Sequence, residues 1–271
     1  MRLSGFAGLT PVVKNLLIIN ALFYIGTWSI LNFTKGQIDL TRYLALYYPE
    51  SEHFRTWQLV SYMFMHATDF THILFNMFAV WMFGTTLEQT WGPKRFLTFY
   101  LVTGIGAGLI HLLVLWFQFA GVHDALVLFS ANPSPQDFEI IVSKYFKNIV
   151  NPEWTSQIAY AWNQEPDNMS IAQEAVKGLS NLYTAQINVP TVGASGAVFG
   201  LLLAFGMLFP NSVIYLYFAI PIKAKYFVIL YGAAELYFGI TNTGGSNIAH
   251  FAHLGGMIFG FFLIKYWSIR R

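Results

Sequence analysis

A serine, an asparagine and three histidines in apolar surroundings are the residues of this sequence best suited to chemistry. Ser195 lies in the stretch TVGASGAVFG, which leads into a long apolar run. His72 and Asn76 occur four residues apart in HILFN, and His250 and His253 occur three apart in NIAHFAHLGG. Each spacing places the pair on one face of a helix. Because polar side chains are costly inside a bilayer, such residues in apolar segments indicate a functional site.

Together these side chains could carry out nucleophilic catalysis. A serine hydroxyl becomes an effective nucleophile when a base removes its proton, and neutral imidazole is a suitable base near pH 7. The oxyanion that forms needs hydrogen-bond donors, which the His72 ring, the Asn76 amide and the Ser195 backbone N–H could supply. The apolar segments contain no aspartate. We therefore expect a dyad and not a triad.

The composition places these residues in a membrane protein. Of 271 residues, 55% are hydrophobic and only 10% are charged, against about 25% charged in soluble domains. Segments of roughly 20 apolar residues can cross a bilayer as helices. Six candidates occur, at about 16–33, 72–86, 96–119, 192–209, 226–241 and 248–267. We therefore expect an all-α, polytopic bundle of six transmembrane helices, forming one domain over residues 1–271.

Basic residues near the segment ends indicate the orientation. They gather in the N-terminal tail, in the loops after the second and fourth segments, and in the C-terminal tail. Both termini are therefore expected in the cytoplasm, and a bacterial plasma membrane is the expected location. The second, fourth and sixth segments would then all begin near the outer face. This brings Ser195, Asn76 and the histidines to a similar depth.

A long insertion over residues 120–190 separates the third and fourth segments. It contains seven acidic residues and three lysines. Ser134 and Asn151 each precede a proline, as residues that cap the start of a helix often do. Apolar residues also recur at helical spacing in MSIAQEAVKGLSNLY. We expect two or three amphipathic helices here, on the extracytoplasmic side.

Glycines near Ser195 predict close helix packing. The fourth and sixth segments each contain one pair of glycines four residues apart, Gly196 with Gly200 and Gly256 with Gly260. Missing side chains let two helices approach closely in lipid. Such an approach would bring Ser195 within reach of a histidine. Gly193 and Gly196 would also leave the backbone beside Ser195 open to a substrate carbonyl.

The remaining features exclude several other classes. The chain has no cysteine, so disulfides, thiol nucleophiles and cysteine-bound metals are excluded. A net charge of +2 with no basic tract gives no support for a nucleic-acid partner. An intramembrane metalloprotease would show H-E-x-x-H, and HILFN and HFAHL lack its glutamate. An intramembrane aspartyl protease would need two buried aspartates, and the apolar segments contain none. The G-x-S-x-G elbow of α/β-hydrolases fails because Ala197 replaces the last glycine.

These motifs resemble those of the rhomboid family of intramembrane serine proteases. The matching stretches, in family order, are HILFN, EQTWG, GASGAVFG and AHLGGMIFG. The stretch WQLVSYMFMHATDFTHILFNM is also similar to the membrane-associated first loop of that family. The resemblance implies cleavage of membrane-anchored proteins in or near their transmembrane segments, through an acyl-enzyme. It implies no metal and no other cofactor; the expected partners are the lipid bilayer and transmembrane substrates.

The resemblance also assigns roles to residues. The implied nucleophile, general base and two oxyanion ligands are Ser195, His253, His72 and Asn76, in that order. Phe199 is implied as an aromatic residue packed against the base. The family pattern Ala-His-x-x-Gly followed by Gly-xxx-Gly fits His253 and not His250. We expect His250, nearer the water, to be solvated.

Two other functions stay open. A catalytically inactive rhomboid relative could bind transmembrane clients, although such proteins usually lack the serine or the histidine. A small transporter is less favoured, because no inverted repeat is evident. Glu235 in the fifth segment could tune substrate gating, but a structural acid is the favoured interpretation, and His111 is expected to pack. Gly244 and Gly245 could form a lid hinge or an ordinary turn.

Overall fold

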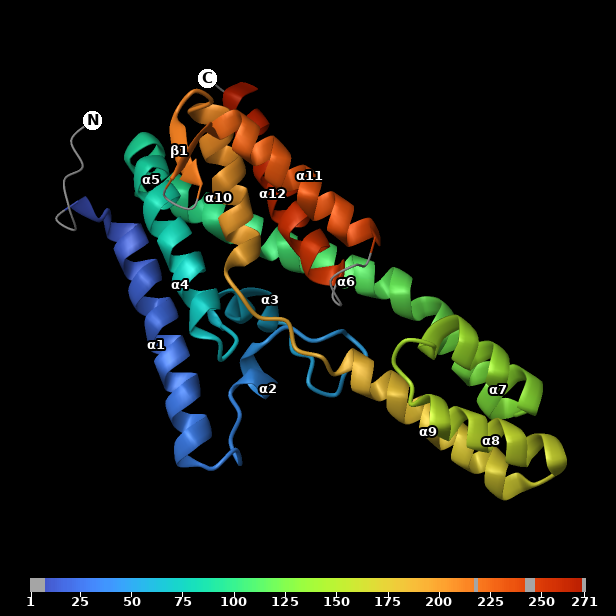
Figure 1. Cartoon of the computed structure of the whole chain (residues 1–271). Coiled ribbons are helices and arrows are strands. Elements are labelled where there is room, and N and C mark those ends of the chain that lie inside the picture. The colour runs from blue at the N-terminus through green and yellow to red at the C-terminus, as the bar shows by residue number, and fades with distance from the viewer. Residues whose placement is uncertain (1–7, 217–218, 242–246, 270–271) are drawn as a thin grey trace. The chain divides into compact units, whose positions relative to one another are not determined.

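The computed structural model describes residues 8–216, 219–241 and 247–269 (Figure 1). The chain forms two compact units. Unit 1 consists of Met1–Tyr47, His53–Val114 and Pro190–Arg271, and unit 2 consists of Tyr48–Glu52 and Leu115–Val189. The Gly244–Gly245 pair, considered above as a hinge or a turn, lies outside the described residues.

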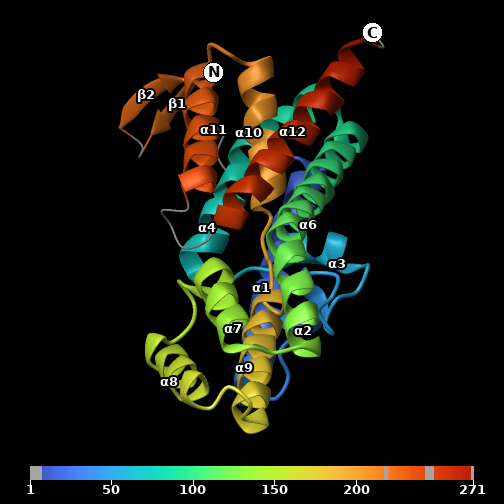
Figure 2. The same cartoon turned by 90° about the vertical axis from the view of Figure 1, so that its right-hand side faces the viewer.

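Unit 1 is built mainly of helices (Figures 1 and 2). Its longer helices are α1 (Pro11–Phe33), α4 (Phe70–Ala79), α5 (Thr85–Trp91), the first part of α6 (Pro93–Ala131), α10 (Ser195–Leu208), α11 (Ala224–Thr241) and α12 (Asn247–Ile269). A π-helical turn, η3 (Val80–Gly84), joins α4 to α5. Between α1 and α4 lie the short elements α2 (Thr41–Leu44), α3 (Gln58–Ser61) and η2 (Tyr62–Phe64). The antiparallel hairpin of β1 (Val213–Leu216) and β2 (Ile220–Lys223) precedes α11.

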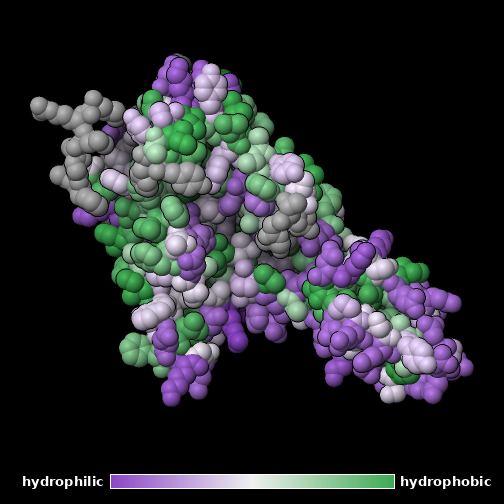
Figure 3. All heavy atoms as spheres, in the orientation of Figure 1, coloured by the Kyte–Doolittle hydropathy of each residue, from purple (hydrophilic) through white to green (hydrophobic). Residues whose placement is uncertain are grey.

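Within the described residues, four helices are long and apolar enough to cross a membrane. They are α1, the continuous run Phe70–Trp91, α6, and Ala249–Ile269 within α12. The apolar helix α10 has only 14 residues, which corresponds to about 21 Å. Two of the six expected segments, those that became α10 and α11, are therefore not among the four. Large apolar side chains are exposed along α1 (Figure 3), with Leu22 at 63% and Phe33 at 89%, as expected of a helix in lipid.

Helix α6 departs most from the expected boundaries. The third segment was expected at 96–119, but α6 continues to Ala131 and has 39 residues. No proline interrupts it after its first residue, and Asn132–Pro133 follow its end. At 1.5 Å per residue it is about 58 Å long, nearly twice the hydrocarbon thickness of a bilayer. The first residues of the expected insertion thus belong to this helix.

Unit 2 contains the end of α6 and further helices. These are α7 (Pro135–Ile141), the π-helical turn η4 (Val142–Phe146), α8 (Pro152–Gln164) and α9 (Met169–Ile187). The two predicted caps are confirmed, because Ser134 Oγ accepts from the Asp137 N–H at 3.1 Å and Asn151 Oδ1 accepts from the Glu153 N–H at 2.8 Å. The core of unit 2 combines aromatic and aliphatic side chains, and Trp162 and Phe146 are fully buried in it.

A buried carboxylate joins two helices of unit 1. Glu88 on α5, only 3% exposed, accepts hydrogen bonds from the N–H groups of Val12 at 3.0 Å and Val13 at 2.9 Å. The Thr10 hydroxyl also donates to it. The first N–H groups of a helix have no partner within the helix, and a negative charge is favourable there. The EQTWG motif therefore anchors the start of α1.

Candidate active site between α10, α11 and α12

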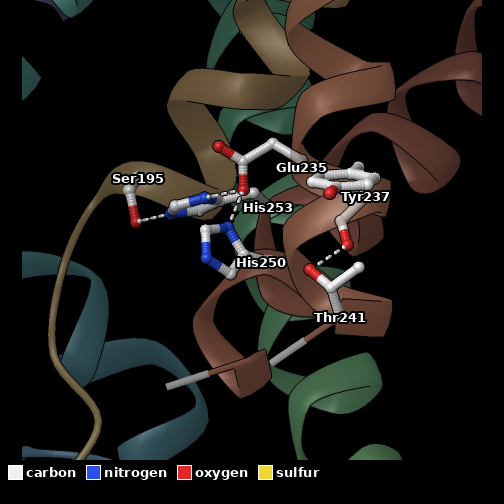
Figure 4. Close-up of polar contacts among 6 residues, drawn as sticks. All are labelled: Ser195, Glu235, Tyr237, Thr241, His250 and His253. Atoms are coloured by element: carbon white, nitrogen blue, oxygen red, sulfur yellow. Dashed lines mark hydrogen bonds and ion pairs between the residues drawn. The ribbon is translucent and has the colours of Figure 1, made fainter. Parts of the chain in front are cut away.

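Ser195 and His253 meet where α10 and α12 pack together (Figure 4). Nε2 of His253 lies 3.0 Å from the Ser195 hydroxyl oxygen, although 58 residues separate the two along the chain. This is a hydrogen-bond distance, and the hydroxyl can donate to Nε2 when that nitrogen carries no proton. Both side chains are partly exposed. The arrangement is the contact that a serine nucleophile and its base require.

Glycine makes the close approach of α10 and α12 possible. A Cβ added to Gly256 would lie 1.8 Å from the carbonyl oxygen of Gly196. One turn further, a Cβ added to Gly260 would lie 3.5 Å from the Cα of Gly200. The two small-residue pairs thus lie against each other. Any side chain at Gly256 would push the two helices apart, and this would separate Ser195 from His253.

Helix α6 packs against glycines of both helices. A Cβ added to Gly196 would lie 2.3 Å from the Cβ of Ala107 on α6, and one added to Gly255 would lie 3.2 Å from the Ala107 Cα. Gly196 was expected to leave the backbone open to a substrate. The structure corrects this expectation, because Gly196 is buried and its missing side chain makes room for α6.

The chain that leads to Ser195 is fixed by backbone hydrogen bonds. Leu46 and Thr191 exchange two bonds of 2.9 Å, and the Gly193 N–H donates to the carbonyl of Tyr62 at 3.0 Å. Gly193 has a φ of +130°, a conformation that favours glycine. These contacts fix the backbone just before α10, and Ser195 is the first residue of that helix.

The candidate oxyanion donors come from α4 and from the start of α10. A Cβ added to Gly193 would lie 3.3 Å from His72 Nε2 and 3.6 Å from Ser195 Oγ, so the His72 ring lies near the hydroxyl. Ala194 provides no side-chain cap for α10, so the first N–H groups of that helix lack a capping side chain. Asn76 is buried one turn along α4, and its amide nitrogen donates to the His72 carbonyl at 2.9 Å.

A stack of rings holds the plane of the His253 imidazole. Phe199, one turn after the serine, lies parallel to it with ring centroids 4.1 Å apart and planes 7° apart. Tyr231 on α11 stacks on Phe199 at 5.3 Å, and Phe227 stacks on Tyr231 at 5.5 Å. The sequence interpretation placed Phe199 here but not the two α11 residues. Their spacing of four residues on an apolar helix was the available signal.

The second nitrogen of His253 contacts an acid from α11. Nδ1 of His253 lies 2.9 Å from Oε2 of Glu235, and Nδ1 of His250 lies 2.7 Å from the same oxygen. Glu235 is 8% exposed, and Figure 4 shows both rings directed at its carboxylate. His250 is therefore paired and not merely solvated. The expected pair of serine and histidine is in contact with a third residue.

The sequence of this site matches a known family. The Rhomboid domain family matches residues 53–122 and 169–270, which is more than half of the chain. The chain belongs to the rhomboid family. With its four candidate spans, this rhomboid protein is a polytopic helical membrane protein.

Distant relatives carry the family name. The rhomboid chain is 26% identical to "RHOMBOID-like protein 12, mitochondrial" from Arabidopsis thaliana over 245 residues, which cover 90% of this chain and 55% of that protein. It is 26% identical to "Rhomboid protease GlpG" from Yersinia pestis over 98 residues, which cover 36% of this chain and 33% of GlpG. A GlpG of Yersinia pseudotuberculosis gives the same values. The chain therefore matches about half, or a third, of the length of these relatives.

The rhomboid match is interrupted at residues 123–168. This gap contains the last residues of α6 together with α7 and α8, whereas α9 lies within the second matched stretch. The rhomboid domain therefore resumes inside the region that was expected as an insertion over residues 120–190. Ser195, Glu235 and His253 all lie within the matched residues.

Two polar residues of the rhomboid chain have partners that sequence reasoning did not identify. Glu235 is the only acidic residue of α11, and a lone carboxylate in an apolar segment requires a partner. The histidines of the sixth segment were the available candidates. His111 on α6, expected only to pack, lies with Nε2 2.6 Å from the Thr191 hydroxyl oxygen, in the strand-like segment before Ser195.

Glu235, His250 and His253 are also close enough to act as metal donors. One donor atom from each lies within 4.8 Å of the others, and zinc sites use such ligands. The hydrogen bonds among the three side chains give an alternative account of the cluster. A serine nucleophile with a histidine base needs no metal, so no metal enters the mechanism proposed below.

Proposed function

We propose that this rhomboid protein is an intramembrane serine endopeptidase that cleaves membrane-anchored proteins in or near their transmembrane segments. The observation that carries the proposal is the 3.0 Å contact between Ser195 Oγ and His253 Nε2. Membership of a family that includes proteins named rhomboid protease supports the same class of reaction. Ser195 is the proposed nucleophile and His253 the proposed general base.

In the proposed reaction, His253 Nε2 removes the hydroxyl proton as Ser195 Oγ attacks the carbonyl carbon of the peptide bond. The Ser195 backbone N–H, the His72 ring and Asn76 would stabilise the oxyanion, each donor contributing about 3 kcal/mol. Asn76 can take part because its amide has two N–H groups and the bond to His72 uses one. The protonated His253 then gives its proton to the leaving amine, and an acyl-enzyme forms on Ser195. Water activated by His253 hydrolyses this ester.

We also propose that α10 and α11 cross the membrane with the four longer spans, giving the six-helix bundle. At about 21 Å, α10 is shorter than the hydrocarbon core of about 30 Å, so Ser195 would lie below the outer surface. Irregular backbone at that depth must be paired within the protein, as the bonds of Thr191 and Gly193 are. A substrate helix would have to unwind locally to reach Ser195.

The charge pattern supports a proposed orientation for this bundle. Both termini would lie in the cytoplasm of a bacterial cell, with the protein in the plasma membrane. The chain would form a single rhomboid domain over residues 1–271. The helical insertion over residues 120–190, most of which lies in unit 2, would then be extracytoplasmic.

Cleavage of a transmembrane reporter substrate in detergent tests the proposal. We expect the wild type to cleave and Ser195→Ala and His253→Ala to lose at least about a thousandfold in kcat. A fluorophosphonate probe should attach to Ser195 of the wild type. His250→Ala also removes an imidazole, but it leaves the contact between His253 and Ser195 intact. We therefore expect kcat to fall less in His250→Ala than in His253→Ala.

Equal rates for wild type, Ser195→Ala and His253→Ala would refute the serine mechanism. A wild type that binds the reporter in a pull-down but neither cleaves it nor takes up the probe would be an inactive relative that binds transmembrane clients. Transport of a solute without cleavage would support the transporter alternative.

A further inference from the structure

We propose that Glu235 is a positioning residue that holds His253 in the tautomer a general base requires. The inference rests on the proposed function and concerns the same site. A neutral imidazole carries its proton on only one of its two nitrogens. A base for Ser195 needs a free electron pair on Nε2, so the proton must be on Nδ1.

The contact of Nδ1 with the carboxylate selects this tautomer. Glu235 Oε2 lies 2.9 Å from His253 Nδ1, and an ionised carboxylate can only accept hydrogen bonds. With the proton on Nδ1, that bond forms and Nε2 accepts from the Ser195 hydroxyl at 3.0 Å. With the proton on Nε2, the Nδ1 electron pair would face a negative oxygen. The carboxylate would also stabilise the imidazolium that forms when Ser195 loses its proton.

His250 has a different place in this cluster. Its Nδ1 lies 2.7 Å from the same Glu235 oxygen, while its ring is nearly perpendicular to that of His253, at 88° with centroids 6.4 Å apart. His250 thus donates a second hydrogen bond that fixes the carboxylate and favours its ionised form. Loss of His250 would loosen the carboxylate but leave its contact with His253.

A purely structural Glu235 is the alternative. In that case the acid would only join α11 to α12, and its replacement would lower stability and activity together. A positioning residue instead changes the rate of the chemical step in a protein that stays folded. The two roles therefore differ in how kcat, KM and the unfolding temperature respond to the same substitution.

Steady-state kinetics of the full-length protein in detergent separates these roles. Glu235→Gln keeps the size of the side chain but removes its charge, and we expect kcat to fall by about 10²- to 10⁴-fold with KM within about threefold. Glu235→Asp should restore part of the loss, and His250→Ala should lose about tenfold or less. Tyr237→Ala, an exposed site on the same helix, should keep the wild-type kcat. An unchanged kcat in Glu235→Gln would overturn the proposal, as would a fall in activity explained entirely by a lower unfolding temperature.

The tautomer itself can be measured without catalysis or a variant at Glu235. In ¹⁵N-histidine-labelled Ser195→Ala protein, the His253 signals, assigned by their loss in Ser195→Ala/His253→Gln, should show the proton on Nδ1. A proton on Nε2 would refute the proposal. If the wild type neither cleaves substrate nor takes up the probe, the proposed function fails, whereas this spectrum still decides whether His253 carries its proton on Nδ1, as the contact with Glu235 requires.

Discussion

The two units of the protein differ in how their helices begin and in how closely two of their helices approach. In unit 2, large side chains fill the core, with Trp162 and Leu179 fully buried. Asparagine side chains also cap its helices, because Asn151 accepts from the N–H of Glu153 and Asn168 accepts from the N–H groups of Ser170 and Ile171. Burial of apolar surface and capped helix starts both stabilise packed helices of this kind.

Unit 1 also buries large side chains, with Phe96 and Phe99 fully buried, but between α10 and α12 missing side chains bring two helices together. Gly256 lies against Gly196, and Gly260 against Gly200, as in membrane proteins where lipid competes for apolar surface. The start of α10 also has no side-chain cap. A cap would occupy the N–H groups that the proposed oxyanion needs. The comparison teaches that side-chain caps satisfy the starts of α8 and α9 in unit 2, whereas the uncapped start of α10 in unit 1 leaves N–H groups for the proposed oxyanion.

The largest expected effect is that of a methyl group between α10 and α12. In Gly256→Ala the new Cβ would lie 1.8 Å from the Gly196 carbonyl oxygen. The contact is with backbone and cannot be relieved by a rotamer change, so we expect a loss above about 4 kcal/mol or failure to fold. Thermal unfolding of the purified protein in detergent measures it.

Gly26→Ala on α1 is the matched control. Nothing lies within 4 Å of a Cβ added at Gly26, so alanine should be neutral or should stabilise the helix by about 0.5–1 kcal/mol. Similar losses in both variants would mean that the glycine contact between α10 and α12 is not what stabilises unit 1.

A second prediction removes the central side chain of unit 2. Trp162 is fully buried and packs near Phe129 and Phe138, so Trp162→Ala should destabilise unit 2 by about 3–5 kcal/mol. Trp116→Ala, at a 52% exposed position of the same unit, should cost far less. Limited proteolysis within residues 132–168 reports the loss. If the units are independent, Ser195 in both variants should still take up the fluorophosphonate probe, and loss of labelling only in Trp162→Ala would show that they are coupled.

The sequence was sufficient for the features that depend on local pattern. Apolar runs located the helices, proline after a capping residue located the starts of α7 and α8, and spacing located the glycine pairs. The end of α6 was missed because apolar residues continue beyond the length of one membrane span, so hydropathy gives no signal at residue 119. Gly196 was misinterpreted because spacing shows that a side chain is missing but not which neighbour fills the space.

Contacts between distant helices could not be predicted in the same way. The position of Glu235 depends on how α11 is rotated against α12, and one acidic residue in an apolar helix does not determine that rotation. The bond between His111 and Thr191 depends on the path of an irregular segment. Physical reasoning could state that Glu235 needs a partner, but the choice between partners required the three-dimensional structure.

A third prediction concerns how the stability of unit 1 depends on pH. It rests on His66, which lies outside the four candidate spans. Burial, reinforced by the neighbouring His72, lowers the pKa of His66 from 6.5 to about 4. Below pH 6.5 the unfolded chain binds a proton at His66 that the folded protein does not, so stability should fall as the pH drops from about 6.5 toward 4. At about 1.4 kcal/mol per pKa unit, the loss could reach about 3 kcal/mol. Unfolding temperatures across this range measure it.

Replacement of the ring tests this assignment. His66→Phe keeps the size of the buried side chain but cannot bind a proton, so its stability should depend less on pH than that of the wild type. His123→Gln in unit 2 is the control, because the His123 side chain is 47% exposed. An unchanged pH dependence in His66→Phe would show that other groups cause it.

The smallest expected effect is the loss of a helix cap in unit 2. Asn168 Oδ1 accepts from the N–H groups of Ser170 at 3.0 Å and Ile171 at 3.4 Å. Asn168→Ala leaves these donors to water and should cost about 1 kcal/mol. Asn181→Ala, at an exposed position within α9, should be neutral or slightly stabilising because alanine favours helix interiors. Hydrogen exchange of the first turn of α9 should increase only in Asn168→Ala. No increase in Asn168→Ala, or an equal increase in both variants, would mean that this cap does not specifically stabilise the start of α9.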